Sequence, residues 1–198
     1  MTKKILMLVL LLAPMSLFAQ KFATFNYGDV MQSLPGYRAA YTELQAVSKQ
    51  YDDSLEEMAK EYQTKLEKYR KEITDETLPV IRQRAEQELQ QLQERFQQAQ
   101  QDNANALSQQ QSQKMQPLVQ RVLDAVNALA TEGGYTYILD RSAAQQAGIF
   151  INESLSEDVT KKIQDKLGVT AADIQAGKAF AAQLQQEAQR QQQQQGQR

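Results

Sequence analysis

The residue types that most often carry catalysis are scarce in this chain of 198 residues. It contains no histidine and no cysteine, so the commonest general base, the commonest metal ligands and the thiol nucleophile are all missing. Carboxylate pairs do occur, at residues 52–53, 56–57 and 75–76, but such pairs on helices usually provide solubility and i,i+4 pairing with lysine. The sequence has no glycine-rich phosphate or dinucleotide motif. We therefore predict that the protein is not an enzyme and uses no cofactor or metal.

The N-terminal segment MTKKILMLVLLLAPMSLFAQ has the three-part layout of a secretory signal peptide. Two lysines precede an apolar run from Ile5 to Leu12, and the small residue Ala19 precedes a polar one. The run is shorter than the roughly 20 residues of a membrane span. We predict a cleavable signal peptide at 1–19 and an exported protein; a retained membrane anchor is the alternative.

The charge balance argues against nucleic acid as a partner. Removal of Lys3 and Lys4 with the leader reduces the 22 basic residues to 20, against 24 acidic ones, which is a net charge of −4. No excess of positive charge is then available to neutralise phosphates. Because no cysteine is present, packing or assembly must supply the stability that disulfides give to many exported proteins.

A glycine-free stretch of 96 residues, 37–132, occupies the middle of the chain and is rich in strong helix formers. Apolar residues recur there in steps of three and four, which predicts a coiled-coil stripe. The stripe consists of Tyr51, Leu55, Met58, Tyr62, Leu66, Tyr69 and Ile73, and then of Ile81, Ala85, Leu89, Leu92, Phe96 and Ala99.

Between the two halves of the stripe, the segment EITDETLPVI (72–81) contains capping residues and a proline suited to the first turn of a helix. We predict an antiparallel hairpin with its tip near 74–80; one helix kinked at Pro79 is the alternative. Pro117 lies inside the second arm, next to a polar stretch, and should cause a bend or flexible joint there.

The segments that flank the helices are strand-like. KFATFNY (21–27), YTYILD (135–140) and GIFIN (148–152) are predicted strands, and 154–169 is a predicted helix with Ser156 as its cap. The Gln-rich tail at 169–198 is predicted to be disordered.

The hairpin brings its own ends together and so places KFATFNY beside YTYILD. A sheet of three short strands cannot support an independent core. Apolar residues occur on both of its faces, more than one small helix can cover, so we expect the sheet to be buried by other copies of the chain.

These segments, in this order and spacing, resemble the Skp/OmpH family of periplasmic chaperones. The resemblance covers about residues 21 to 168 and rests on KFATFNYGDVMQSLPGYRAAYTEL, the charged helical middle, and GGYTYILDRSAAQQAGIFINESLSEDVTKKI. It implies a mostly α, α+β chain that forms a jellyfish-like homotrimer. The β-sheet body would comprise 20–36 plus 133–168, and the helical-hairpin tentacle 37–132.

The resemblance also implies roles for individual residues. The trimer interface would be formed by Phe22, Phe25, Tyr27, Tyr135, Tyr137, Leu139, Ile149 and Ile151. Contacts with an unfolded client would come from Tyr51, Tyr62, Tyr69, Leu92 and Phe96, although packing within the hairpin is the other interpretation of the tyrosines. Basic residues near the tip are Lys65, Lys68, Arg70, Lys71, Arg82 and Arg84, which form either a solvated face or a surface for transient membrane contact.

The implied function is that of an ATP-independent periplasmic holdase, which holds unfolded outer-membrane β-barrel proteins in a cavity between tentacles and prevents their aggregation. A non-enzymatic coiled-coil spacer or tether in the cell envelope is the alternative. A spacer would favour a strong stripe throughout, whereas this stripe weakens around 103–113.

Overall fold

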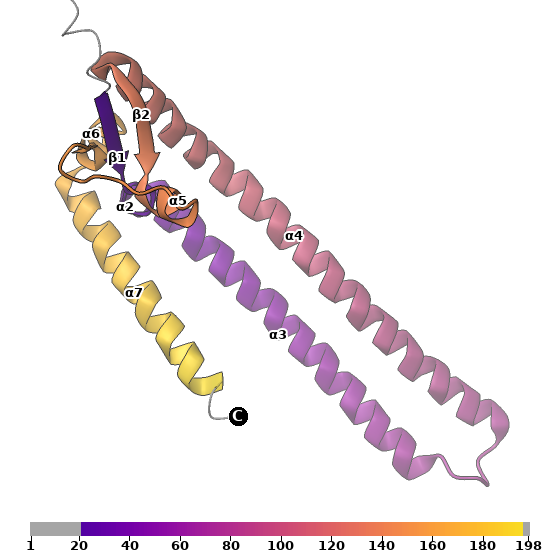
Figure 1. Cartoon of the computed structure of the whole chain (residues 1–198). Helices are drawn as coiled ribbons and strands as arrows, with labels where there is room; N and C mark the ends of the chain where they lie inside the picture. The colour runs from indigo at the N-terminus through magenta and orange to yellow at the C-terminus, as the bar shows by residue number, and fades with distance from the viewer. Residues whose placement is uncertain (1–20, 196–198) are drawn as a thin grey trace, which may run out of the picture. The chain divides into compact units, whose positions relative to one another are not determined.

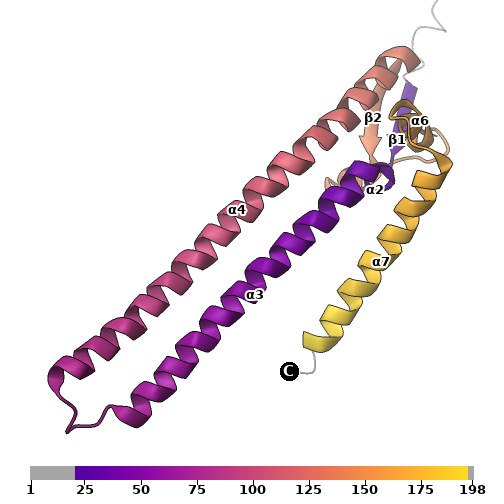
Figure 2. The ribbon, with the colours of Figure 1, turned by 180° about the vertical axis from the view of Figure 1, so that it is seen from behind.

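The computed structural model of the protein describes residues 21–195, so the predicted signal peptide at 1–19 lies outside the described residues. The described chain is mainly helical (Figure 1 and Figure 2). It also contains a three-stranded sheet. This confirms the mostly α, α+β class. The chain divides into two compact units: Gly36–Pro117 forms one, and the described residues up to Pro35 and from Leu118 onward form the other.

The sheet consists of three strands in the order β2-β1-β3, which are β1 (Lys21–Phe25), β2 (Tyr135–Asp140) and β3 (Glu157–Asp158). β1 is parallel to both neighbours, and Phe22 lies opposite Tyr137 in β2. A parallel pair needs a long crossover between its strands. The two long helices provide that crossover, so the predicted pairing of KFATFNY with YTYILD is confirmed.

The third strand is not the predicted one. We expected GIFIN (148–152) to form it, but this segment is not a strand and β3 pairs with β1 instead. The cause is the end of α5 (Arg141–Gln146). Gly148 there adopts a left-handed conformation (φ 71°), and the amide of Ile149 donates to the carbonyl of Ala144. The segment therefore closes a helix rather than adding to the sheet.

The first strand ends earlier than predicted. β1 stops at Phe25 rather than at Tyr27, because Asn26 caps α2 (Tyr27–Ser33). The side chain of Asn26 accepts a 3.1 Å hydrogen bond from the amide of Asp29. This cap therefore ends the strand two residues before its predicted end.

The helix predicted at 154–169 is also shorter, and Ser156 is not its cap. α6 spans Thr160–Lys166, because β3 occupies two of the residues directly before it. The carboxylate of Asp158, at the end of β3, accepts a 2.9 Å hydrogen bond from the amide of Thr160. Pairing with β1 thus decides where α6 begins.

The two long helices are α3 (Pro35–Glu72) and α4 (Pro79–Gly133), joined by residues 73–78. This confirms the hairpin and rules out the single kinked helix. The hydroxyl of Tyr69 donates a 2.8 Å hydrogen bond to Glu86 on the other arm.

Within the hairpin, the predicted stripe is the less exposed face of each arm. Most of its residues are half-buried, Leu92 is buried, and Ile81 departs from the pattern because it is 50% exposed. α4 continues through Pro117, where the boundary between the two units also falls. The bend or joint at this proline stays a prediction.

The C-terminal segment is not disordered over its described part. α7 spans Ala171–Gln195 and packs on α2 (Figure 1). Thr170 and Asp173 form reciprocal hydrogen bonds at its start, including Asp173 N to Thr170 Oγ1 at 3.2 Å. Alanine and glutamine are good helix formers, so docking on α2 is enough to order a sequence whose composition suggests disorder.

Candidate functional site

The hairpin carries a small apolar groove at mid-length. Its lining residues are Ala59, Tyr62 and Gln63 of α3 and Gln93 and Phe96 of α4, and its volume is about 270 Å³. Tyr62 and Phe96 belong to the predicted stripe, and both remain half-buried. Two helices alone cannot cover both aromatic side chains, so apolar area stays open to another molecule.

The structure does not gather the other predicted client-contact residues in this groove. Leu92 is 8% exposed and packs within the hairpin. The hydroxyl of Tyr51 accepts a 3.4 Å hydrogen bond from Gln110, and that of Tyr69 donates to Glu86. The bond to Glu86 is the main reason that the pKa of Tyr69 is raised. Both tyrosines therefore tie the two arms together.

The predicted trimer-interface residues separate into two groups. Phe25 and Tyr135 are 6% and 8% exposed, so their side chains are packed within the single chain. Phe22 and Tyr137 are exposed, and their rings stack with centroids 5.8 Å apart. Ile149 is also exposed.

The remaining three predicted interface residues, Tyr27, Leu139 and Ile151, are half-buried. Phe150, which sequence reasoning did not select, is 99% exposed. The β-branched and aromatic residues of GIFIN were the signal for it, because this apolar run pairs with no strand among residues 21–195.

A charge cluster that sequence reasoning missed holds β3 in place. The hydroxyl of Tyr135 donates a 2.6 Å hydrogen bond to Glu157, and the ammonium of Lys162 donates to the same carboxylate. Lys21 lies 3.7 Å from this carboxylate and 4.0 Å from the centre of the Tyr135 ring. Hydrogen bonds from Lys162, then from Tyr135, lower the pKa of Glu157 to about 2.

No spacing in the sequence predicts this cluster, because its four members come from four elements. The neighbouring Asp140 has a comparable role. It ends β2, and its carboxylate accepts hydrogen bonds from the amides of Tyr27 and Ala143, which lie in the first turns of α2 and α5. Burial, followed by the charge of Asp140, raises the pKa of Tyr27.

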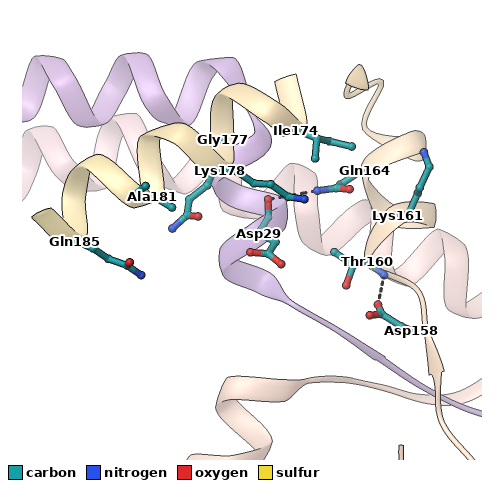
Figure 3. Close-up of a pocket in the computed structure, with 12 residues that line it drawn as sticks. Asp29, Asp158, Thr160, Lys161, Gln164, Ile174, Gly177, Lys178, Ala181 and Gln185 are labelled. Atoms are coloured by element: carbon teal, nitrogen blue, oxygen red, sulfur yellow. Dashed lines mark hydrogen bonds between the residues drawn. The ribbon is translucent and has the colours of Figure 1, made fainter. Parts of the chain in front are cut away.

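A second groove lies where α7 meets α2 and α6 (Figure 3), with a volume of about 480 Å³. The amide of Gln164 donates to the Asp29 carbonyl at 3.4 Å, and Lys178 of α7 reaches toward the same region. Gly177 lines this groove at the point where α7 packs closely on α2. An isolated glycine inside a helical stretch often has a packing reason, and this was the signal available for it in the sequence.

Three apolar side chains are exposed at the tip of the hairpin. Leu78, Val80 and Ile81 are 62%, 65% and 50% exposed. Of the predicted basic residues at the tip, Lys65 pairs with Glu88 and Lys68 lies 3.9 Å from Glu72.

Arg82 donates a 2.7 Å hydrogen bond to the carbonyl of Thr74. Arg70, Lys71 and Arg84 make no ion pair or hydrogen bond with another side chain within residues 21–195.

In the part of the chain that is described, no three acidic side chains gather closely enough to hold a metal ion. Among the helices of residues 21–195, none combines the length and the apolar character that crossing a bilayer demands.

Comparison with known proteins agrees with these features. The family described as "Outer membrane protein (OmpH-like)" matches residues 21–167, which include the sheet, both long helices and α6. No curated protein matches the chain. α7 lies beyond the matched residues, so its packing on α2 is a feature outside the family pattern. Since the match covers the sheet and the whole hairpin, the chain belongs to the OmpH-like family.

Proposed function

We propose that the protein is an ATP-independent holdase chaperone of the periplasm, which binds unfolded outer-membrane β-barrel proteins and prevents their aggregation. Proteins of the OmpH-like family are chaperones of outer-membrane proteins, and membership of that family supports this general role. The absence of a phosphate-binding motif from the sequence supports independence from ATP.

The observation that carries the proposal is the half-buried aromatic stripe of the hairpin, with Tyr62 and Phe96 at its groove. A holdase needs apolar area that is available to a client but too dispersed to cause self-association. Tyrosine and phenylalanine supply that area at low cost in side-chain entropy. Many such weak contacts on linked arms would hold an unfolded chain through high effective concentration.

The holdase would act as a homotrimer assembled through the sheet. A three-stranded sheet of this size has too little core to stand alone. Phe22 and Tyr137 on the sheet, and Ile149 and Phe150 after α5, are exposed apolar side chains that another copy of the chain could cover. β2 is an edge strand, with its outer backbone groups unpaired by β1. A cavity between three hairpins would then receive the client.

The test is suppression of aggregation by the mature chain, residues 20–198. An outer-membrane β-barrel protein unfolded in urea is diluted into buffer with and without the chaperone, and light scattering is recorded. We expect suppression near one trimer per client. The double substitution Tyr62→Ser and Phe96→Ser should weaken it several-fold, whereas the control Leu123→Ser, at an exposed apolar position outside the groove, should not.

The outcomes separate the hypotheses. If the unmodified chain leaves scattering unchanged, the protein is not a holdase and the passive spacer becomes the better interpretation. If it suppresses scattering and the double variant does so equally well, the function stands but the groove is not the client site. The solution mass of each variant is measured in parallel, because a loss of assembly would have to be separated from a loss of binding.

A further inference from the structure

The groove between α2, α6 and α7 has the size of a small-ligand site. Its volume of about 480 Å³ lies within the range of roughly 300–1,000 Å³ that is typical of ligand pockets. The three helices that line it belong to the same compact unit of the chain (Figure 3). One of them, α7, lies beyond the residues matched by the OmpH-like family, so the chaperone role of that family does not account for the groove.

The wall that α7 contributes is smooth and apolar over most of its length. Ile174, Gly177, Ala181 and Ala182 line it. Ile174 and Ala181 are half-buried and Ala182 is exposed, so part of this wall is open to another molecule. Since three of the four residues are glycine or alanine, a ligand can approach the helix closely.

A buried carboxamide in the groove has unused hydrogen-bonding capacity. Gln164 of α6 is 5% exposed, and its side chain makes one hydrogen bond among residues 21–195, the 3.4 Å donation to the carbonyl of Asp29. A carboxamide has an acceptor oxygen as well as two donor hydrogens. The oxygen of Gln164 therefore accepts no hydrogen bond from the described chain, whereas buried polar groups normally have a partner. A ligand that donates a hydrogen bond would supply one.

Two opposite charges at the rim of the groove also lack a partner. The carboxylate of Asp29 and the ammonium of Lys178 form no ion pair or side-chain hydrogen bond within the described part of the chain. The other charged groups of the rim, Lys161 and Asp158, already have ion-pair partners at 2.8 Å and 3.1 Å. Figure 3 shows Asp29 of α2 and Lys178 of α7 beside Gln164. The groove thus offers one negative group, one positive group and one neutral acceptor.

We infer that the groove binds a short peptide that carries both a free ammonium and a free carboxylate. The ammonium of the peptide pairs with Asp29, its carboxylate pairs with Lys178, and a peptide N–H donates to the oxygen of Gln164. The α7 wall from Ile174 to Gln185 is about 16 Å long, which is the length of about five extended residues. This site is separate from the groove of the hairpin and does not depend on the holdase function.

The charges of the groove favour a zwitterionic peptide over other small ligands. A phosphate or a polyanion would meet the carboxylates of Asp29 and Asp158 at the rim. A purely cationic ligand would leave Lys178 unpaired and close to a like charge. A purely apolar ligand would leave the buried oxygen of Gln164 without a donor, which costs free energy. A peptide with two charged ends satisfies all three groups.

Saturation-transfer NMR with the mature chain, residues 20–198, tests the site with tetra-alanine as the probe. Four forms are compared: the free peptide, the N-acetylated peptide, the C-amidated peptide and the doubly blocked peptide. We expect the free peptide to bind and each single block to raise its dissociation constant by roughly fivefold. No binding of the free peptide, or equal binding of all four forms, would overturn the inference.

Variants of the rim assign each end of the peptide. In Asp29→Asn, N-acetylation should no longer weaken binding while C-amidation still does; in Lys178→Gln the reverse should hold. Arg190→Gln, at an exposed position of α7 outside the groove, is the control and should behave as the natural chain. If both blocks still weaken binding in both rim variants, the peptide binds elsewhere and the proposal is wrong.

A further variant fills the groove without disturbing the packing of α7 on α2. Ala182 is exposed, so Ala182→Trp should leave helicity and the hydrogen-exchange protection of α7 unchanged. Its indole would occupy the apolar wall and should raise the dissociation constant of tetra-alanine at least tenfold. Unchanged affinity in this variant would contradict binding in the groove.

Discussion

The hydroxyl of Tyr135 donates a 2.6 Å hydrogen bond to the carboxylate of Glu157, and this bond joins β2 to β3 across the strand that separates them. β3 has two residues, so its backbone pairing with β1 is short. Side-chain contacts from Tyr135, Lys162 and Lys21 therefore contribute a large part of what holds this strand. The position of α6 depends on them, because α6 starts two residues after β3.

Glu157 should make the stability of the body depend on pH in the acidic range. Its pKa in the folded chain, about 2, lies below the ordinary value of 4.5, so the carboxylate stabilises the fold above pH 4.5. That contribution is lost as the pH falls from about 4.5 to 2. We expect Glu157→Gln to lower the urea midpoint at pH 7 and the difference from the natural chain to shrink toward pH 2. Urea titrations monitored by circular dichroism at several pH values measure this.

A control and a contradicting result are available for Glu157. Glu94 lies on the exposed surface of α4, where its carboxylate accepts a hydrogen bond from Gln90, and Glu94→Gln should change the midpoint little at any pH. If Glu157→Gln shifts the midpoint by the same amount at pH 7 and at pH 2, the ionised carboxylate is not what stabilises β3.

Gly177→Ala should loosen α7, although alanine is the better helix former. A Cβ at this position would lie 2.8 Å from the carbonyl oxygen of Gln32, too close for the two helices to keep their spacing. Helix propensity alone favours alanine over glycine by about 1 kcal/mol, so the predicted loosening of α7 is opposite to the effect of helix propensity. Hydrogen exchange should show reduced protection of the α7 amides. Gln186→Ala on the exposed face is the control, and increased protection in Gly177→Ala would refute the close contact.

Tyr137→Asp and Ile149→Asp should dissociate the proposed trimer without unfolding the single chain, because both side chains are exposed in it. A charge at an apolar interface must be desolvated without a partner, which strongly disfavours assembly. Light scattering should show the mass fall to that of one chain, with helicity retained. Leu123→Asp serves as the matched control. Phe25→Asp is a poor test, since Phe25 is buried and its substitution should unfold the body.

Pro117→Ala should stabilise α4. The proline lacks the amide that would donate to the carbonyl of Gln113, and its replacement in a helix interior gains up to about 3 kcal/mol. We expect a higher thermal midpoint and stronger hydrogen-exchange protection in residues 110–120 than in Gln116→Ala. Unchanged protection would mean that the helix already accommodates the proline and that no joint exists there.

The sequence predicted those features that depend on residue type and local spacing. The stripe of Tyr62 and Phe96 and the turn at 73–78 follow from periods of three and four or from backbone preferences of single residues. Because the hairpin folds back on itself, the two strands that flank it are brought side by side. For these elements, neighbours in the chain supply the relevant interactions, so composition and pattern were sufficient.

Tertiary structure decided what depends on partners distant in the chain. The strand beside β1 is the two-residue β3 rather than GIFIN, because the segment after α5 is used to end that helix. α7 is ordered because Gly177 permits close packing on α2, some 145 residues earlier in the chain. The exposure of Leu78 and Val80 follows from the position of the turn. These outcomes depend on geometric fit between separated segments, and no local period in the sequence encodes such a fit.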